Sequence, residues 1–151
     1  MKTVESQDWI IDIPDDWDKK ESDIEGKLYF ESEDKTNGLY ISTHFNRDSL
    51  EYNNEKIISN LNIDKTHLKN MSGYNFKIAN EKIFNDQGLI IGLIDSFDKS
   101  KNYRICIKYI AYRHIFVRLT CHDYDFNDSD LTTNIIDEIL DSLRLKHKLL
   151  N

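Results

Sequence analysis

The densest group of potential ligands in the chain is an acidic stretch, DYDFNDSD, which begins at Asp123. Asp123, Asp125 and Asn127 alternate as the first three ligands of a calcium-binding loop do. That loop also requires Gly at its sixth position and Glu at its twelfth, where this chain has Asp128 and Asn134. Both requirements fail. We therefore predict a loop between a strand and a helix, whose last three residues cap the helix.

The histidines and cysteines show no spacing typical of a metal site or a nucleophile–base pair. The five histidines, none of them in an HxH or HExxH pair, are His44, His67, His114, His122 and His147. Cys121 and His122 are neighbours in a predicted strand, so their side chains point to opposite faces and do not act together. Cys106 could act as a nucleophile only with a distant His, and the favoured interpretation is a small buried residue. The chain also lacks GxSxG, P-loop and GxGxxG motifs, so the sequence predicts no enzyme, no cofactor and no metal.

Three basic residues of the predicted sheet, Arg104, Lys108 and Arg118, leave two interpretations open. If they share one face, they form an anion-binding patch. A pocket lined by Arg104, Lys108 and His122 would then indicate a small-ligand binder, or an enzyme whose site is assembled from scattered side chains. The favoured interpretation is that their stems cover the sheet while their charges meet nearby Asp or Glu residues.

Charge and composition narrow the class of partner. The net charge of −7 disfavours nucleic acid and anionic membrane, because both require a basic surface. A basic protein surface is the expected partner. The expected contact residues lie in acidic loops and are Asp15, Asp16, Asp123, Asp125, Asp128 and Asp130. We therefore predict a small acidic protein-binding module, for example an immunity protein that neutralises a toxin. An accessory structural subunit, marked by an exposed aromatic patch, is the alternative.

The length, the N-terminal sequence and the cysteine content predict the domain organisation and the cellular compartment of the protein. The 151 residues fit a single globular domain over residues 1–151, monomeric or weakly dimeric. The N-terminal sequence MKTVESQDW has no apolar segment of a signal peptide. The longest aliphatic run, Leu89 to Ile94, is far shorter than the ~20 residues that span a bilayer. Two cysteines without an export signal indicate a reducing, cytoplasmic compartment.

Hydrophobic periodicity predicts strands and helices in an α+β order. The predicted strands are Trp9–Ile13, a hairpin of Lys27–Ser32 and Leu39–Phe45, and a meander of Phe76–Phe84, Leu89–Phe97, Tyr103–Tyr112 and Ile115–Cys121. The predicted helices are Leu50 to about Leu61 and Leu131–Leu145. Because LIIGLI is apolar on both faces, its strand is expected at the centre, covered on both sides. The predicted fold is α+β: an antiparallel sheet of about six or seven strands flanked by helices, with the C-terminal helix packed on the sheet. The long helices are expected on one face, and loops or a helix are expected to cover part of the second face.

The two strands that carry the cysteines admit two registers. With a two-residue loop at Arg113-His114, Cys106 faces Cys121, and one face of the sheet mixes charged with apolar residues. A shift by one residue places Ile105 opposite Cys121 and makes that face entirely apolar or aromatic. Burial favours the shifted register, which predicts cysteines on opposite faces and two free thiols.

The order of core positions resembles that of the PsbP-like superfamily. The chain opens with WIIDIP and DDW, continues to YFESEDKTNGLYIS and ends on IIDEILDSLRL. The matching positions, spread in order over the chain, are Trp9, Ile13, Pro14, Trp17, Phe30, Leu39, Ile41, Ile139, Leu140 and Leu143. This superfamily includes an extrinsic photosystem subunit and a Ran-GTPase-binding import factor. The resemblance implies a sheet flanked by helices and binding to other proteins rather than catalysis, and it transfers no site residue.

Overall fold

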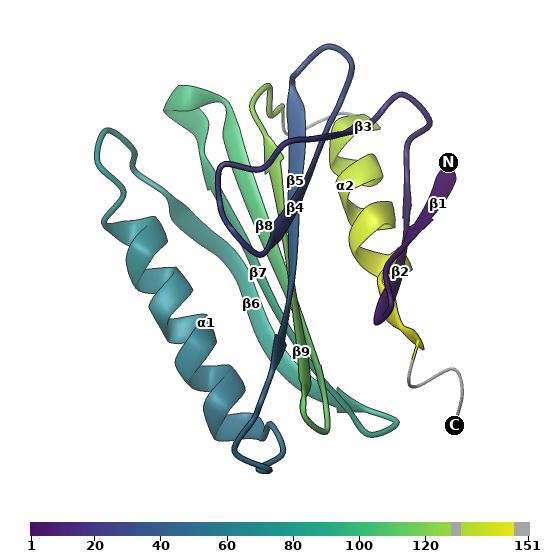
Figure 1. Ribbon diagram of the computed structural model, residues 1–151. Helices are drawn as coiled ribbons and strands as arrows, with labels where there is room; N and C mark the ends of the chain where they lie inside the picture. Colours follow the sequence, from purple (N-terminus) through teal and green to yellow (C-terminus); the bar gives the residue numbers. More distant parts are fainter. Residues whose placement is uncertain (128–130, 147–151) are drawn as a thin grey trace.

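A seven-stranded antiparallel sheet forms the middle of the molecule (Figure 1). In this computed structural model, which describes residues 1–127 and 131–146, the strand order is β3-β4-β5-β9-β8-β7-β6. Its strands are β3 (Asp18–Lys20), β4 (Lys27–Glu31), β5 (Asn37–Phe45), β6 (Lys77–Asp86), β7 (Leu89–Asp98), β8 (Tyr103–Tyr112) and β9 (Ile115–Asp123). A second sheet has the order β1-β2-β10, with β1 (Lys2–Glu5), β2 (Trp9–Ile13) and β10 (Arg144–Leu145). The predicted α+β class with an antiparallel sheet is confirmed.

The helices α1 (Asn54–Lys69) and α2 (Leu131–Ser142) cover opposite faces of the large sheet (Figure 1). Ile57 of α1 packs in one core with Ile107 of β8, whereas Ile139 of α2 packs in another with Ile110 of the same strand. The small sheet covers α2 from outside, since β2 contacts that helix. The prediction that the long helices share one face was therefore wrong. Strands that are apolar on both faces need cover on both.

The apolar strand β7 is covered on both sides, as expected, but it is not central. It lies beside the edge strand β6, and β9 is the middle strand. Gly92 of β7 makes room for a large neighbour, because a Cβ there would lie 2.9 Å from Cδ2 of Tyr109. The absent side chain lets the Tyr109 ring pack closely against β7 on the face that α1 covers.

Both chain termini differ from the predicted elements. The polar segment Lys2–Glu5 forms β1, which was not predicted, by pairing with β2. The last helix ends at Ser142 rather than at Leu145, because Arg144 and Leu145 pair with β2 as β10. Leu145 is buried there and thereby ties the chain end to the small sheet. None of the helices in the described part of the chain is both long and apolar enough to cross a bilayer.

The first helix is longer than predicted and begins later. Asn53 is its N-cap, and the Asn53 side chain accepts a hydrogen bond of 2.9 Å from the N–H of Lys56. The buried face of α1 consists of Ile57, Leu61 and Leu68. Leu50, the first residue of the predicted helix, is exposed in the preceding loop. Few apolar residues in an Asn-rich segment made the ends of the helix hard to place.

The hairpin of β8 and β9 has the register that the sequence analysis rejected. Cys106 is the direct partner of Cys121, and Lys108 is the partner of Leu119. The two-residue turn places Arg113 in the left-handed region, with φ 56°. The prediction failed because the charged residues on this face are paired inside the protein. Lys108 Nζ, for example, donates to the carbonyl oxygen of Leu140 at 2.5 Å.

Candidate functional site

The predicted acidic contact residues differ in exposure. Asp15 and Asp16 are exposed between β2 and β3, and Asp125 is exposed just after β9. Asp123, at the end of β9, is only 1 % exposed. Its Oδ1 accepts the N–H of Asp125 at 3.0 Å, so Asp123 orders the loop rather than presenting charge. The other two predicted residues, Asp128 and Asp130, lie outside the described residues.

The chain from residue 15 to residue 35 concentrates the negative charge along one edge of the large sheet. This segment includes β3 and β4 and contains nine acidic and four basic residues, a net charge of −5 out of −7 for the whole chain. Its exposed carboxylates, here called the acidic edge, belong to Asp15, Asp16, Asp18, Glu21, Asp23, Glu25, Glu33 and Asp34. Most of the charge excess thus lies on one side of the molecule.

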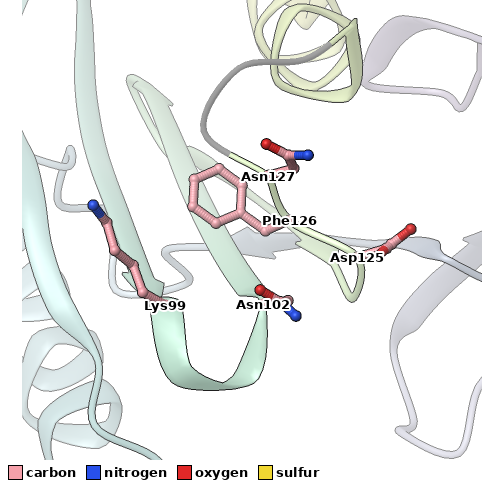
Figure 2. A pocket seen from close by; sticks show the side chains of 5 residues that line it. All are labelled: Lys99, Asn102, Asp125, Phe126 and Asn127. Atoms are coloured by element: carbon pink, nitrogen blue, oxygen red, sulfur yellow. The ribbon is translucent and has the colours of Figure 1, made fainter.

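The loop after β9 joins the acidic edge to the turn between β7 and β8. Tyr124 N–H donates to the carbonyl of Thr36 at 2.8 Å, and Phe126 N–H donates to the carbonyl of Asn102 at 2.8 Å. A shallow pocket of about 380 Å³ lies here, lined by Lys99, Asn102, Asp125, Phe126 and Asn127. In Figure 2 the polar side chains of this pocket point in different directions around the Phe126 ring. They do not converge on one ligand position.

A group of tyrosines, here called the tyrosine patch (Tyr74, Tyr103 and Tyr124), lies beside this loop. The Tyr103 ring lies 5.0 Å from that of Tyr124 and 5.5 Å from that of Tyr74, measured between centroids. Tyr74 and Tyr124 are 40 % and 45 % exposed. Because Tyr124 is bonded through its backbone to Thr36, the patch adjoins the acidic edge.

The three basic residues of the sheet do not share a face. Arg104 and Lys108 point toward α2, whereas Arg118, the partner of Tyr109, points toward α1. Arg104 donates to both carboxylate oxygens of Asp95 at 3.0 Å and is paired with Asp137 at 3.2 Å. The predicted shared patch, and a pocket of Arg104 and Lys108 with His122, are therefore excluded by geometry. The interpretation in which charges meet nearby carboxylates is confirmed for Arg104 and Arg118. Lys108 differs, because its ammonium donates to the carbonyl oxygen of Leu140.

The two cysteines lie side by side beneath α2, and both are free thiols. Burial raises the pKa of Cys121 to about 12 and raises that of Cys106 well above its ordinary value. The Sγ of Cys106 donates to Asp95 Oδ1 at 3.2 Å. Neither thiol ionises near neutral pH, so neither supplies a thiolate nucleophile. Among the residues with described positions, no three His, Cys, Asp or Glu side chains form a group suited to a metal ion.

A second cavity, of about 280 Å³, lies between α1 and the part of the sheet that α1 leaves open. Its floor includes Tyr40 of β5 and Thr120 of β9, and Leu68 of α1 forms one wall. Ile24, from the segment between β3 and β4, reaches its rim. Apolar walls with a few polar groups are typical of small-molecule sites. We call this cavity the α1 pocket.

Arg118 is held rigidly at the floor of the α1 pocket. Its Nε and Nη2 donate to Oδ2 and Oδ1 of Asp64 at 3.0 and 2.9 Å, and its Nη1 donates to Thr120 Oγ1 at 2.8 Å. Asp64 also accepts the hydroxyl of Tyr109, whose pKa is raised by burial and by this contact. The bidentate pair fixes the guanidinium plane and neutralises one of the positive charges in the pocket.

His122 lies in the same pocket and is neutral near pH 7. Burial, and then the positive charges of Arg118 and Lys27, lower the pKa of His122 to about 4. Its Nδ1 lies 2.6 Å from the hydroxyl of Tyr103. When that hydroxyl donates, Nε2 carries the ring proton and becomes a hydrogen-bond donor.

Lys27 brings an additional positive charge to the rim. It is half-buried in β4, and Ser42 of β5 separates it from Arg118 along one row of the sheet. Burial, followed by repulsion from Arg118, lowers the pKa of Lys27. Within the described residues, Lys27 has neither a hydrogen-bonded nor an ion-paired carboxylate. Arg118 and His122 were singled out from the sequence. Lys27 and Asp64 were not, because three separate elements, β4, α1 and β9, bring these residues together.

Comparisons with known proteins identify the fold. No family model matches the sequence, and no curated protein matches it either. The structure of cyanobacterial PsbP (CyanoP) from Synechocystis sp. PCC 6803 superposes with a TM-score of 0.72 at 10% identity, over 95% of this chain and 91% of that one. A structure from Bacteroides thetaiotaomicron superposes with a TM-score of 0.53 at 16% identity, over 91% of this chain and 45% of the other. The predicted PsbP-like fold is confirmed.

Proposed function

We propose that this protein is a non-catalytic binding module that recognises a basic surface of another protein through its acidic edge and its tyrosine patch. The observation that carries the proposal is their adjacency. The acidic edge concentrates the charge that steers a basic partner, and Tyr74 and Tyr124 offer aromatic anchors next to it. Tyrosine is among the residues that contribute most to binding energy at protein interfaces.

The chemistry of the other candidate residues supports a binding role over catalysis. The basic residues Arg104 and Arg118 are engaged by carboxylates, and burial keeps both cysteines protonated. The PsbP-like fold is an analogy for function only, so the proposal depends on the surface rather than on the fold.

The proposed partner class is a basic protein, for example a toxin that this chain neutralises as an immunity protein. An inhibitor of this kind gains fast association from complementary charge. The partner would then be harmful to cells when it is produced alone, and co-production of this chain would restore growth.

The test compares two variants with the same change in net charge. Asp15→Asn/Asp16→Asn/Asp125→Asn neutralises exposed carboxylates at and beside the acidic edge, whereas Asp48→Asn/Glu51→Gln/Asp86→Asn neutralises exposed carboxylates at the opposite end of the sheet. Each immobilised variant is exposed to an extract of the source organism, and retained proteins are identified by mass spectrometry. We expect a basic partner that the wild type and the second variant retain and the first variant loses. Equal retention by both variants, or an acidic partner, would refute the proposal.

A further inference from the structure

The α1 pocket carries a net positive charge in a protein whose overall charge is −7. Lys27 and Arg118 contribute two positive charges and Asp64 contributes one negative charge, so these three residues leave one net positive charge. His67 and His122 also line the pocket. The Lys27 ammonium is partly withdrawn from water, and its Asp64 neighbour is already paired with Arg118. An anion bound beside Lys27 would offset the cost of that partial desolvation.

The hydrogen-bonding capacity of the two cations is not used up. The three bonds of Arg118 to Asp64 and Thr120 occupy three of its five N–H donors. The Lys27 ammonium has three donors, and Nε2 of His122 can supply another. Rigid donors that remain free in a cavity are what an anionic group binds.

The rest of the cavity is apolar. Ile24, Leu68, Met71, Ile105 and Ile107 line it together with the ring of Tyr40. At about 30 Å³ for each displaced water, 280 Å³ has room for roughly ten non-hydrogen atoms. The ligand is therefore small and has an apolar body as well as a charged group.

We propose that the α1 pocket binds a small organic anion, with its carboxylate or phosphate between Lys27 and Arg118 and its apolar body against Leu68 and Ile107. This site adjoins the acidic edge at Ile24 and the tyrosine patch at His122. It uses different charged groups from the proposed protein-binding surface, so either proposal can fail while the other holds. The anion supplies the negative charge that Lys27 lacks, and the apolar walls exclude fully hydrated inorganic ions.

The test uses three probes of one shape and nearly one size: benzoate, neutral benzamide and cationic benzamidine, with phenyl phosphate as a second anion. Each is titrated into the labelled protein and followed by two-dimensional amide NMR. We expect saturable shifts at Tyr40, Leu68 and Thr120 with benzoate or phenyl phosphate, and about tenfold weaker binding of benzamide. If neither anion gives saturable shifts in the pocket, or if all three isosteric probes bind equally, the proposal is wrong.

A matched pair of variants locates the charge that matters. Lys27→Met keeps the apolar stem and removes the ammonium, whereas Lys77→Met makes the same change at an exposed position of β6. Unchanged dispersion of the amide spectrum shows that each variant is folded. We expect Lys27→Met to weaken benzoate or phenyl phosphate binding by about tenfold and Lys77→Met to leave it unchanged. Equal affinity in both variants would contradict the assignment.

Discussion

Removal of the Asp64 carboxylate tests how much its contacts with Arg118 and Tyr109 stabilise the α1 pocket. Asp64→Ala leaves Arg118 without its bidentate partner and Tyr109 without its acceptor. The side chains of Arg118 and Asp64 are 21 % and 15 % exposed, so both charges are largely withdrawn from water. Breaking a fully buried pair costs about 3–5 kcal/mol, and the remaining access of water lowers the expected loss of unfolding free energy to about 2–3 kcal/mol.

Urea unfolding at pH 7 measures this loss directly, and the melting temperature should fall by roughly 4–12 °C. Glu81→Ala is the control, because it breaks the Lys65–Glu81 pair in which the Glu81 side chain is 43 % exposed. That variant should lose less than about 1 kcal/mol. If Asp64→Ala were no less stable than Glu81→Ala, the stabilising role assigned to the Asp64 contacts in the pocket would be refuted. The double variant Asp64→Ala/Arg118→Met should lose less unfolding free energy than the sum of the losses in the two single variants.

Four further changes test the packing and the titratable groups. Ile107→Asp should leave the chain unfolded by circular dichroism, because an unpaired charge at a position only 2 % exposed costs several kcal/mol; a wild-type melting curve would disprove the sheet assignment. Gly92→Ala should lower the unfolding free energy by about 1–3 kcal/mol, since its Cβ would lie 2.9 Å from the Tyr109 ring. The folded pKa of His122, about 4, lies below its ordinary 6.5, so the folded state binds fewer protons and stability falls as the pH drops from 6.5 to 4. Between pH 7 and 4.5 the wild type should lose about 2 kcal/mol more than His122→Gln in urea titrations, and parallel losses would count against the burial of this ring. Both thiols should resist a thiol reagent in the native protein and react after unfolding in guanidinium, whereas fast native reaction would contradict their burial.

Local patterns in the sequence located most strands. Alternation in KLYFES and LYISTHF, with a turn between them, identified the hairpin of β4 and β5, and Phe30 indeed pairs with Leu39. The two-faced LIIGLI segment indicated cover on both sides of β7. It could not reveal the place of β7 in the sheet, which depends on the order of strands far apart in the chain.

Side-chain partners from distant elements caused the main errors. The register of β8 and β9 was misjudged because Arg104 and Lys108 looked unsuited to a buried face. Asp95 and Asp137 pair with Arg104, and the carbonyl of Leu140 accepts from Lys108. Local patterns in the sequence do not predict these contacts, because the partners are far apart in the chain.

The contact role of the acidic residues stays a prediction. Asp15, Asp16 and Asp125 are exposed, whereas Asp123 is buried, which its place in an acidic stretch did not indicate. The α1 pocket was not predicted, since its charged groups come from α1, β4 and β9 and form no motif.

The association rate with the basic partner, measured by stopped flow as a function of salt, tests the proposed function most directly. Between about 0.05 and 0.5 M salt the wild-type rate should fall by roughly tenfold or more, because screening removes charge steering. The rate for Asp15→Asn/Asp16→Asn/Asp125→Asn should be lower at low salt and less sensitive to salt, while Asp48→Asn/Glu51→Gln/Asp86→Asn should follow the wild type. A wild-type rate that does not change with salt would contradict recognition through the acidic edge.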